Sequence, residues 1–410
     1  FFYVWVIFAL SCVRIFAVIG IGHNCWSVYT IPMCDDLGMT RQQFSNFFSI
    51  MMGVEIVALL FIDKIFKKLG QLNTMRIAAV IMPGALLGIS RANGLLGFYF
   101  WTVFLGFGIV ASSFYALSII ITNWFKDNRG TAIGIVFMSS PLGSRVMIPL
   151  VNSWINAYGW RTALVIMAAI MAAICITISG FLMKEKPSDM GLQPYTDPNK
   201  KAAAVSSEPL WGVDRRYVLT SAGGLLMIVS VIGCCMAGSC SNTIVPYLRD
   251  IGFTDTAAAN IHSIGMGLIA LGRFLGGRLS DRFGVTKIMP VAYAISPLVL
   301  VGLILIPYSN AFIPVMLVGF AISQIGNAVC LPLMVELLFG KKNYSSIYGL
   351  FSAVNTSMGA LNPIIYGFFY DRCGSYLPTY KIFLVGGIAG FFTLTVALRL
   401  QLKAKERMTR

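Results

Sequence analysis

Charge and histidine are scarce in this sequence. Only 11% of the 410 residues are charged and 57% are hydrophobic, whereas a soluble domain carries about 25% charged residues. This composition excludes an ordinary soluble protein. The apolar segments run on for about 20 residues, which is the length of a membrane-spanning helix. They do not read as the short alternating strands of a membrane barrel, so we predict an all-α membrane protein.

Sequence signatures of catalysis and metal binding are also missing. The two histidines do not form H-E-x-x-H, and neither G-x-S-x-G nor a Walker A pattern occurs. The nine cysteines contain no C-x-x-C, and most of them lie in apolar segments, where a free thiol behaves as a small hydrophobic group. We therefore predict that the protein is not an enzyme and has no catalytic residue, metal site or cofactor.

The first apolar segment, 2–31, shows no small-residue cleavage site and contains Arg14. These features argue against a signal peptide. We predict a spanning helix here, and we expect the native start of the protein to precede Phe1.

Twelve spans with both termini on the cytoplasmic side account for the basic charge. In this topology 22 of the 31 Lys and Arg residues lie on the inner side, 6 lie outside and 3 lie within spans. Such an excess fixes orientation by the positive-inside rule. The net charge of +15 therefore indicates topology and not nucleic-acid binding. The predicted spans are 2–31, 41–62, 74–91, 95–123, 129–155, 160–183, 217–248, 255–280, 286–308, 312–338, 344–370 and 376–399.

A polar stretch divides the twelve spans into two sets of six. Residues 184–216 are rich in Pro, Ser and Lys, which is typical of a flexible linker. We predict an N-terminal six-helix half at 1–183, a cytoplasmic linker at 184–216, and a C-terminal six-helix half with a short cytoplasmic tail at 217–410.

The two halves are related in sequence. Residues 32–70 align with 246–284 without a gap, and the identities include polar residues and glycines outside the apolar runs. Six helices is an even number, so both copies insert the same way. Such parallel repeats place a substrate site between the halves near mid-membrane. The identities include Pro32/Pro246, Asp36/Asp250, Gly38/Gly252, Thr40/Thr254 and Gly70/Gly284.

The pattern Gly277-x-x-x-Asp281-Arg282-x-Gly284 resembles the loop motif of the major facilitator superfamily. In the first half, Lys67 and Lys68 stand where the motif has Asp and Arg. Three stretches resemble, more narrowly, the monocarboxylate transporter and oxalate/formate antiporter group. They are "GIGHNCWSVYTIPMCDDLGMTRQQFS" (20–45), "NWFKDNRGTAIGI" (123–135), and "LGRFLGG" (271–277) with "YGFFYDRCGSY" (366–376). The resemblance implies the major facilitator fold and transport by alternating access.

Arg273 lies within a predicted span, eight residues before Asp281. At 1.5 Å per residue it is about 12 Å from the inner end, and a charge at mid-bilayer costs roughly 2.5–3.5 kcal/mol. A guanidinium fork matches a carboxylate with two parallel hydrogen bonds. The resemblance implies that this arginine binds the substrate, and the alternative is a structural ion pair. Arg145 is a second candidate anion contact, or a residue that snorkels towards the outer surface.

Arg14 and Glu55 lie about midway along the first two spans. They form either a buried ion pair or, alternatively, a structural arginine beside a proton carrier, Glu55. The resembled eukaryotic carriers have an acid four residues before the eighth-span arginine, where this chain has Ile269. The repeat mate of Ile269 is Glu55, so the acid could come from the other half.

The remaining site candidates are polar residues in the predicted spans and at their inner ends. His262 and His23 are alternative proton-coupling groups, because histidine titrates near neutral pH, although packed and satisfied histidines are common. Glu336 is expected to pair with loop cations in an inner gate that also involves Asp281 and Arg282. The neutral candidates for substrate contact are Asn24, Ser112, Ser113, Tyr115, Asn242, Gln324, Asn327 and Asn355.

These features together predict a secondary active transporter of small organic anions, most of all monocarboxylates. Dicarboxylate exchange of the oxalate type is an alternative, although the span 344–370 has no charge within 344–369 and the resembled antiporter has a lysine there. A non-transporting sensor is a second alternative. The expected partners are the anion, a proton or counter-anion, and the lipid bilayer. We expect a functional monomer in the cell membrane.

Overall fold

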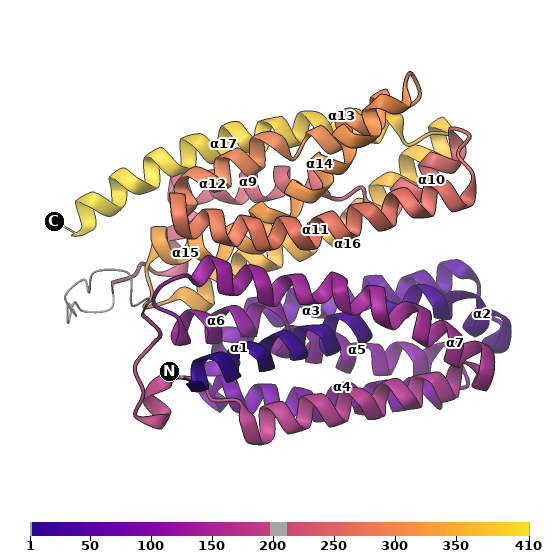
Figure 1. The fold of residues 1–410 in the computed structure, drawn as a ribbon, viewed down its shortest axis with the longest axis horizontal. Coiled ribbons are helices and arrows are strands. Elements are labelled where there is room, and N and C mark those ends of the chain that lie inside the picture. The colour runs from indigo at the N-terminus through magenta and orange to yellow at the C-terminus, as the bar shows by residue number, and fades with distance from the viewer. Residues whose placement is uncertain (1, 197–210, 410) are drawn as a thin grey trace. The chain divides into compact units, whose positions relative to one another are not determined.

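The computed structural model describes residues 2–196 and 211–409, apart from the side chains at 27, 41, 42, 45, 242, 255, 256 and 409. The described residues form helices and no strand, with two isolated β-bridges. The all-α prediction is therefore confirmed for the described part of the chain (Figure 1).

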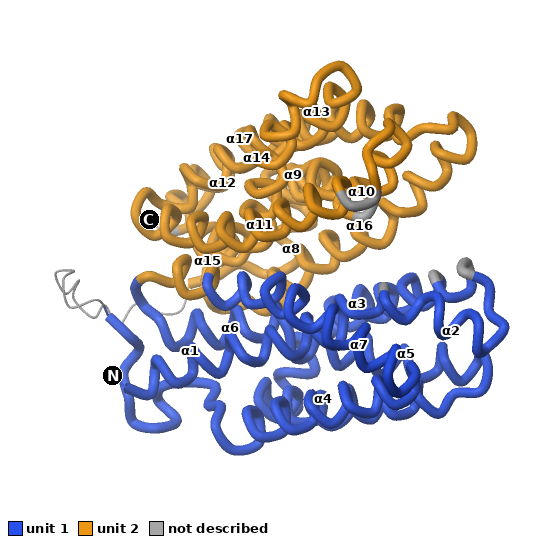
Figure 2. The backbone as a smooth tube through the Cα atoms, turned by 45° about the vertical axis from the view of Figure 1, so that its right-hand side comes forward, with its two compact units in different colours: residues 1–127, 135–198 blue, residues 128–134, 199–410 orange. Residues whose placement is uncertain are grey.

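The chain forms two compact units (Figure 2). Unit 1 contains residues 1–127 and 135–198, and unit 2 contains residues 128–134 and 199–410. The change of unit at residue 198 falls within the predicted linker. The sequence did not predict that 128–134, at the start of a unit 1 helix, would pack with unit 2.

Unit 1 is built from the first seven α-helices, several of which are interrupted. A π-helical stretch and a 3-10 turn break the first predicted span after Ile15. The elements are α1 (Phe2–Ile15), η1 (Phe16–Ile21), η2 (Cys25–Tyr29), α2 (Thr30–Leu37), α3 (Arg41–Leu69), α4 (Gln71–Ser90), α5 (Leu95–Ser112), α6 (Phe114–Trp124), α7 (Arg129–Thr177), η3 (Ile178–Leu182) and η4 (Pro187–Met190).

Unit 2 has the same kind of architecture. One hydrophobic core of this unit is rich in tyrosine, and the buried rings of Tyr247 and Tyr366 both contact that of Tyr380. The elements are α8 (Arg215–Thr220), α9 (Ala222–Gly238), α10 (Ser241–Asp250), α11 (Asp255–Phe283), α12 (Val285–Ile295), α13 (Leu298–Leu305), η5 (Asn310–Phe312), α14 (Ile313–Gln324), η6 (Ile325–Cys330), α15 (Leu331–Phe339), α16 (Tyr344–Cys373) and α17 (Leu377–Thr409).

The repeat seen in the sequence sets equivalent helix boundaries in the two units. Helices α3 and α11 both have 29 residues, and their ends coincide in the repeat alignment. Thr40 and Thr254 each accept a hydrogen bond from the backbone N–H three residues on, which satisfies one of the donors left over at a helix start. Gly70 and Gly284 end the two helices with φ of 83° and 88°, a conformation that favours glycine.

Length and composition mark eight helical stretches of the described chain as able to cross a membrane, or nine if the bent pair α9 and α10 is one span. The count of twelve spans therefore stays a prediction. Helices α3 and α16, with 29 and 30 residues, are not among the eight. The stretch Arg129–Leu182 has 54 residues and is broken at Gly159, where φ is 81°. At about 1.5 Å per residue it is far longer than one bilayer core of about 30 Å.

Candidate functional site

Arg14 is fully buried in unit 1 and is held by five hydrogen bonds. Its nitrogens donate to the carbonyls of Met75, Ser112 and Cys175 and to the hydroxyls of Ser112 and Ser179. The acceptors come from α4, α5, α7 and η3, so this guanidinium ties four elements to α1. The predicted ion pair between Arg14 and Glu55 is wrong, because neutral oxygens satisfy the guanidinium. Ser112, a candidate for substrate contact, holds Arg14 with its carbonyl and its hydroxyl, and its role in substrate binding stays a prediction.

Glu55 lies on α3 and is 8% exposed. Its Oε1 atom is buried and has no hydrogen-bond partner in the described part of the chain. A buried carboxyl in that situation is easier to keep neutral than charged. Of the two interpretations that the sequence left open for Glu55, the ion pair is excluded and the proton carrier stays a prediction.

His23 and Asn24 lie where the first span is interrupted, between η1 and η2. His23 Nδ1 is 3.0 Å from Asn24 Oδ1, and Asn24 Nδ2 donates to Ser144 Oγ on α7 at 2.6 Å. The two helices approach closely here, because a Cβ on Gly20 would lie 3.0 Å from the backbone of Gly143. Arg145 follows Ser144 directly, and its side chain is exposed. Asn24 and His23 are thus brought together as a polar pair at a helix break.

Two other candidates of unit 1 are buried. Tyr115 is 3% exposed, and its ring centroid lies 5.9 Å from that of Phe66. This is a packing contact between α6 and α3. Ser113 is 6% exposed at the junction of α5 and α6. A role in substrate binding for Tyr115 or Ser113 stays a prediction.

Arg273 lies in α11 of unit 2; the residue as a whole is partly exposed, whereas its Nε atom is buried. Its Nη2 atom donates to Gln324 Oε1, at the end of α14, over 3.4 Å. At this point α11 packs tightly against the first turns of α7, because a Cβ on Gly134 of α7 would lie 2.4 Å from the carbonyl oxygen of Arg273. Small residues of this kind let membrane helices approach one another closely. The structure thus places the guanidinium beside a neutral carboxamide within an apolar span.

Asn327 and Asn355 are brought together through a residue that the sequence interpretation missed. Asn327 lies in η6 and Asn355 on α16, and the thiol of Cys235 on α9 bonds to both. Tyr293 on α12 joins these three residues, because its hydroxyl donates to Asn327 Oδ1 at 2.7 Å. A π-helical turn such as η6 is frequent at functional sites. The side chain of Asn242, another candidate, lies outside the described residues.

Asp281 caps the start of α7. Its carboxylate accepts hydrogen bonds from the backbone N–H of Gly130 at 2.8 Å, and from the N–H and hydroxyl of Thr131 at 2.6 Å each. A negative charge at a helix N-terminus is favourable, because the unsatisfied N–H groups there carry partial positive charge. Arg282, the next residue, is exposed and lies 5.2 Å from the ring of Phe283. The loop motif thus holds residues 128–134 in unit 2.

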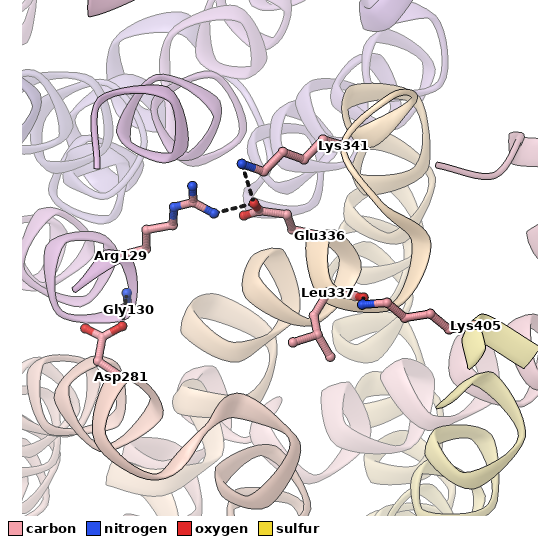
Figure 3. A network of polar contacts seen from close by, with 7 residues as sticks. All are labelled: Arg129, Gly130, Asp281, Glu336, Leu337, Lys341 and Lys405. Atoms are coloured by element: carbon pink, nitrogen blue, oxygen red, sulfur yellow. Dashed lines mark hydrogen bonds and ion pairs between the residues drawn. The ribbon is translucent and has the colours of Figure 1, made fainter. Parts of the chain in front are cut away.

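Glu336 pairs with two cations, as the sequence predicted (Figure 3). Arg129, the first residue of α7, forms an ion pair with its Oε1, and Lys341 Nζ lies 3.3 Å from the same atom. Lys405, on the C-terminal helix α17, donates to the carbonyl of Leu337 at 2.8 Å. The sequence did not predict Arg129 as one of these cations. Whether this cluster acts as an inner gate stays a prediction.

His262 is partly buried on α11, and its Nε2 lies 3.3 Å from Ser241 Oγ at the start of α10. Each of the two histidines therefore has a neutral polar neighbour: Asn24, between η1 and η2, for His23, and Ser241, at the start of α10, for His262.

The described residues contain no group of three or more His, Cys, Asp or Glu side chains arranged to hold a metal ion.

A profile of the Major Facilitator Superfamily matches residues 10–363 and, in a second match, 227–407. Curated relatives include monocarboxylate transporter 12-B of Danio rerio, which is 27% identical over 63% of this chain and 58% of its own length. Monocarboxylate transporter 12 of Rattus norvegicus is 25% identical over 78% of this chain and 71% of its own. The match therefore spans little more than half of the first relative.

Among solved structures, the fold matches that of FucP, a Major Facilitator Superfamily transporter in an outward conformation. The TM-score is 0.69, and the match covers 96% of this chain and 98% of that one. At 14% sequence identity the likeness concerns the fold alone, and it confirms the predicted fold class.

Proposed function

Because this chain belongs to the Major Facilitator Superfamily and is a multi-pass membrane transporter rather than an enzyme, we propose that it carries small organic anions by secondary active transport with alternating access. Monocarboxylates are the proposed substrates. The similarity to monocarboxylate transporters 12-B and 12 supports this class. We further propose the cell membrane as the location, with both termini cytoplasmic, since the Lys and Arg residues concentrate on one side.

Arg273 is the observation that carries the proposal. It places a permanent positive charge inside an apolar span, about 15 Å from the end of α11 at Phe283, and the side chain is partly exposed although its Nε atom is buried. The planar guanidinium offers a carboxylate two parallel, charge-assisted hydrogen bonds. Gln324, its hydrogen-bond partner, is neutral and would orient the fork without neutralising the charge. We therefore assign the carboxylate of the substrate to Arg273.

Coupling to a proton is the second element of the proposal. A monocarboxylate that enters alone carries one negative charge, and a negative-inside potential opposes this by about 2.3 kcal/mol per 100 mV. Net uptake then needs a co-transported cation or an exchanged anion. Glu55 is buried with one carboxyl oxygen lacking a partner, which supports a carboxyl that binds a proton in one step of the cycle and releases it in another.

Uptake of labelled organic acids into proteoliposomes tests the proposal. Arg273→Lys keeps the charge and loses the fork, so we expect uptake to fall about 100-fold, since each hydrogen bond to a charged group contributes about 1.5–3 kcal/mol. Arg273→Ala should abolish uptake. Arg278→Lys is the matched control, because Arg278 is an exposed arginine on the same helix. Normal uptake by a well-folded Arg273→Ala protein would overturn the assignment.

A further inference from the structure

Four polar side chains of unit 2 form a continuous hydrogen-bonded chain. Tyr293 Oη donates to Asn327 Oδ1 at 2.7 Å, and Asn327 Nδ2 donates to Cys235 Sγ at 3.1 Å. The Cys235 thiol in turn donates to Asn355 Oδ1 at 3.0 Å. The chain joins α12, η6, α9 and α16, so four separate helices fix its geometry.

The direction of these hydrogen bonds determines which donors and acceptors of each side chain are already occupied. Asn327 accepts from Tyr293 with its oxygen, and its Nδ2 serves both Cys235 and the carbonyl of Val231 at 3.4 Å. A carboxamide has one oxygen acceptor and two N–H donors, so Asn327 is committed within the protein. Cys235 uses its single proton on Asn355. Each member therefore donates towards Asn355.

Asn355 is the last member of this hydrogen-bonded series. Its oxygen is occupied by the thiol of Cys235, whereas its Nδ2 makes no hydrogen bond within the described residues, and the side chain is partly exposed. A carboxamide can present either its oxygen or its nitrogen, and the neighbouring hydrogen bonds determine which one. The thiol holds the oxygen, so the two N–H donors of Asn355 remain for a ligand.

The chain lies next to the Arg273 region of the same unit. Gln324, which bonds to Arg273, directly precedes the π-helical turn that contains Asn327. On the facing helix α9, a Cβ on Gly238 would lie 3.5 Å from Gln324 Nε2. Cys235 precedes Gly238 by three residues, and Asn327 follows Gln324 by three. Because Gly238 faces Gln324 and Cys235 faces Asn327, α9 runs antiparallel to the helix formed by α14 and η6. The two contacts are therefore about one helical turn apart, or 5.4 Å of rise.

We propose that Cys235 is a positioning residue that orients the Asn355 carboxamide, so that Asn355 Nδ2 donates a hydrogen bond to a neutral oxygen of the substrate. This inference rests on the proposed function, in which Arg273 binds the carboxylate. It adds a second, neutral contact, which selects acids that carry an acceptor oxygen besides the carboxylate over plain acids of the same chain length.

Two labelled acids that differ in this oxygen test the inference. Glycolate carries the additional oxygen and acetate does not. For glycolate we expect Asn355→Leu and Cys235→Ala each to raise the KM about fivefold to tenfold with little change in the maximal rate, which is the size of one lost hydrogen bond. For acetate the same variants should leave the KM within twofold of wild type. Cys235→Ser keeps a donor and an acceptor and should recover part of the glycolate affinity.

The double variant separates positioning from independent effects. If Cys235 acts through Asn355, the combination of Cys235→Ala with Asn355→Leu should be no worse than Asn355→Leu alone. Cys330→Ala is the matched control, since Cys330 is a buried thiol of the same unit that contacts Ser280 instead. It should not change the ratio of the two KM values.

The outcomes distinguish this inference from the proposed function. If wild type takes up neither acid and no other organic anion, the proposed function fails. If wild type takes up both acids in an Arg273-dependent way, but the variants raise both KM values equally or their effects add, the positioning role of Cys235 is overturned while the transport function stands. Should Cys235→Ala fold poorly, Asn355→Leu and Cys235→Ser still give the same comparison.

Discussion

Arg14 and Arg273 both lie within apolar helices of this protein, and their surroundings differ. Arg14 in unit 1 is 0% exposed and donates five hydrogen bonds to carbonyl and hydroxyl oxygens of its own unit. Arg273 in unit 2 is partly exposed and bonds to the carboxamide of Gln324. The structure thus holds one guanidinium by interhelical hydrogen bonds, and it leaves the other side chain partly exposed beside a carboxamide. The proposal that the substrate binds Arg273 and not Arg14 depends on this difference in surroundings.

Removing Arg14 should give the largest effect on stability. Arg14→Met keeps the side-chain length and removes all five interhelical hydrogen bonds. At about 0.6 kcal/mol for each such bond in a membrane protein, the free energy of unfolding should fall by about 3 kcal/mol. Unfolding of the detergent-solubilised protein measures this loss. Uptake per folded molecule should stay near wild type. A stable Arg14→Met protein with lost uptake would assign Arg14 to the transport site and contradict its structural role.

Glu55→Gln should separate net uptake from exchange. Glutamine cannot bind and release a proton, so acid-stimulated net uptake should fall at least tenfold. Exchange of labelled for unlabelled substrate needs no proton release and should remain within about twofold of wild type. Both are measured in one proteoliposome preparation, with inward pH gradients for the first assay. Because Glu55 forms no ion pair with Arg14, we expect little change in stability. Intact proton-driven uptake would remove Glu55 from the mechanism and leave His23, His262 or the substrate itself.

Arg145 gives the smallest expected effect and adds a third arginine to the comparison. It is exposed on α7, one residue after Ser144. If it forms a second anion contact, Arg145→Gln should raise the KM for a dicarboxylate several-fold and change that for a monocarboxylate by less than twofold. Competition of unlabelled oxalate and formate against labelled substrate measures the two. Equal effects on both anions would leave Arg145 with a structural or general electrostatic role.

The sequence predicted those features that repeat along the chain. The gap-free match of 32–70 with 246–284 led to equivalent helices, and α3 and α11 do share their caps at Thr40 and Thr254 and their ends at Gly70 and Gly284. Glu336 was expected to meet loop cations, and it pairs with Lys341 and Arg129. These residues lie at or near helix ends, where polar side chains and glycine have specific backbone roles.

Hydrogen-bond partners that occur in every helix, such as backbone carbonyls, could not be predicted from the sequence. The carbonyls of Met75 and Cys175 hold Arg14, and every residue has a carbonyl, so the sequence suggested the nearest acid, Glu55, instead. Cys235 was one of nine cysteines, and only the fold brings it between Asn327 and Asn355. Residues 128–134 belong to unit 2 because the backbone N–H groups of Gly130 and Thr131 donate hydrogen bonds to Asp281. Asp281 lies about 150 residues further along the sequence.

Binding of an organic anion to purified protein tests directly whether Arg273 holds the carboxylate of the substrate. A ligand stabilises the folded state by RT ln(1 + [L]/Kd), or about 2.7 kcal/mol at 100 times Kd. Wild type and the control Arg278→Gln should therefore show a Tm that rises with the concentration of a transported monocarboxylate. Arg273→Gln should fold and show no rise at the same concentrations. An equal, dose-dependent rise in Arg273→Gln would contradict the assignment of the carboxylate to Arg273.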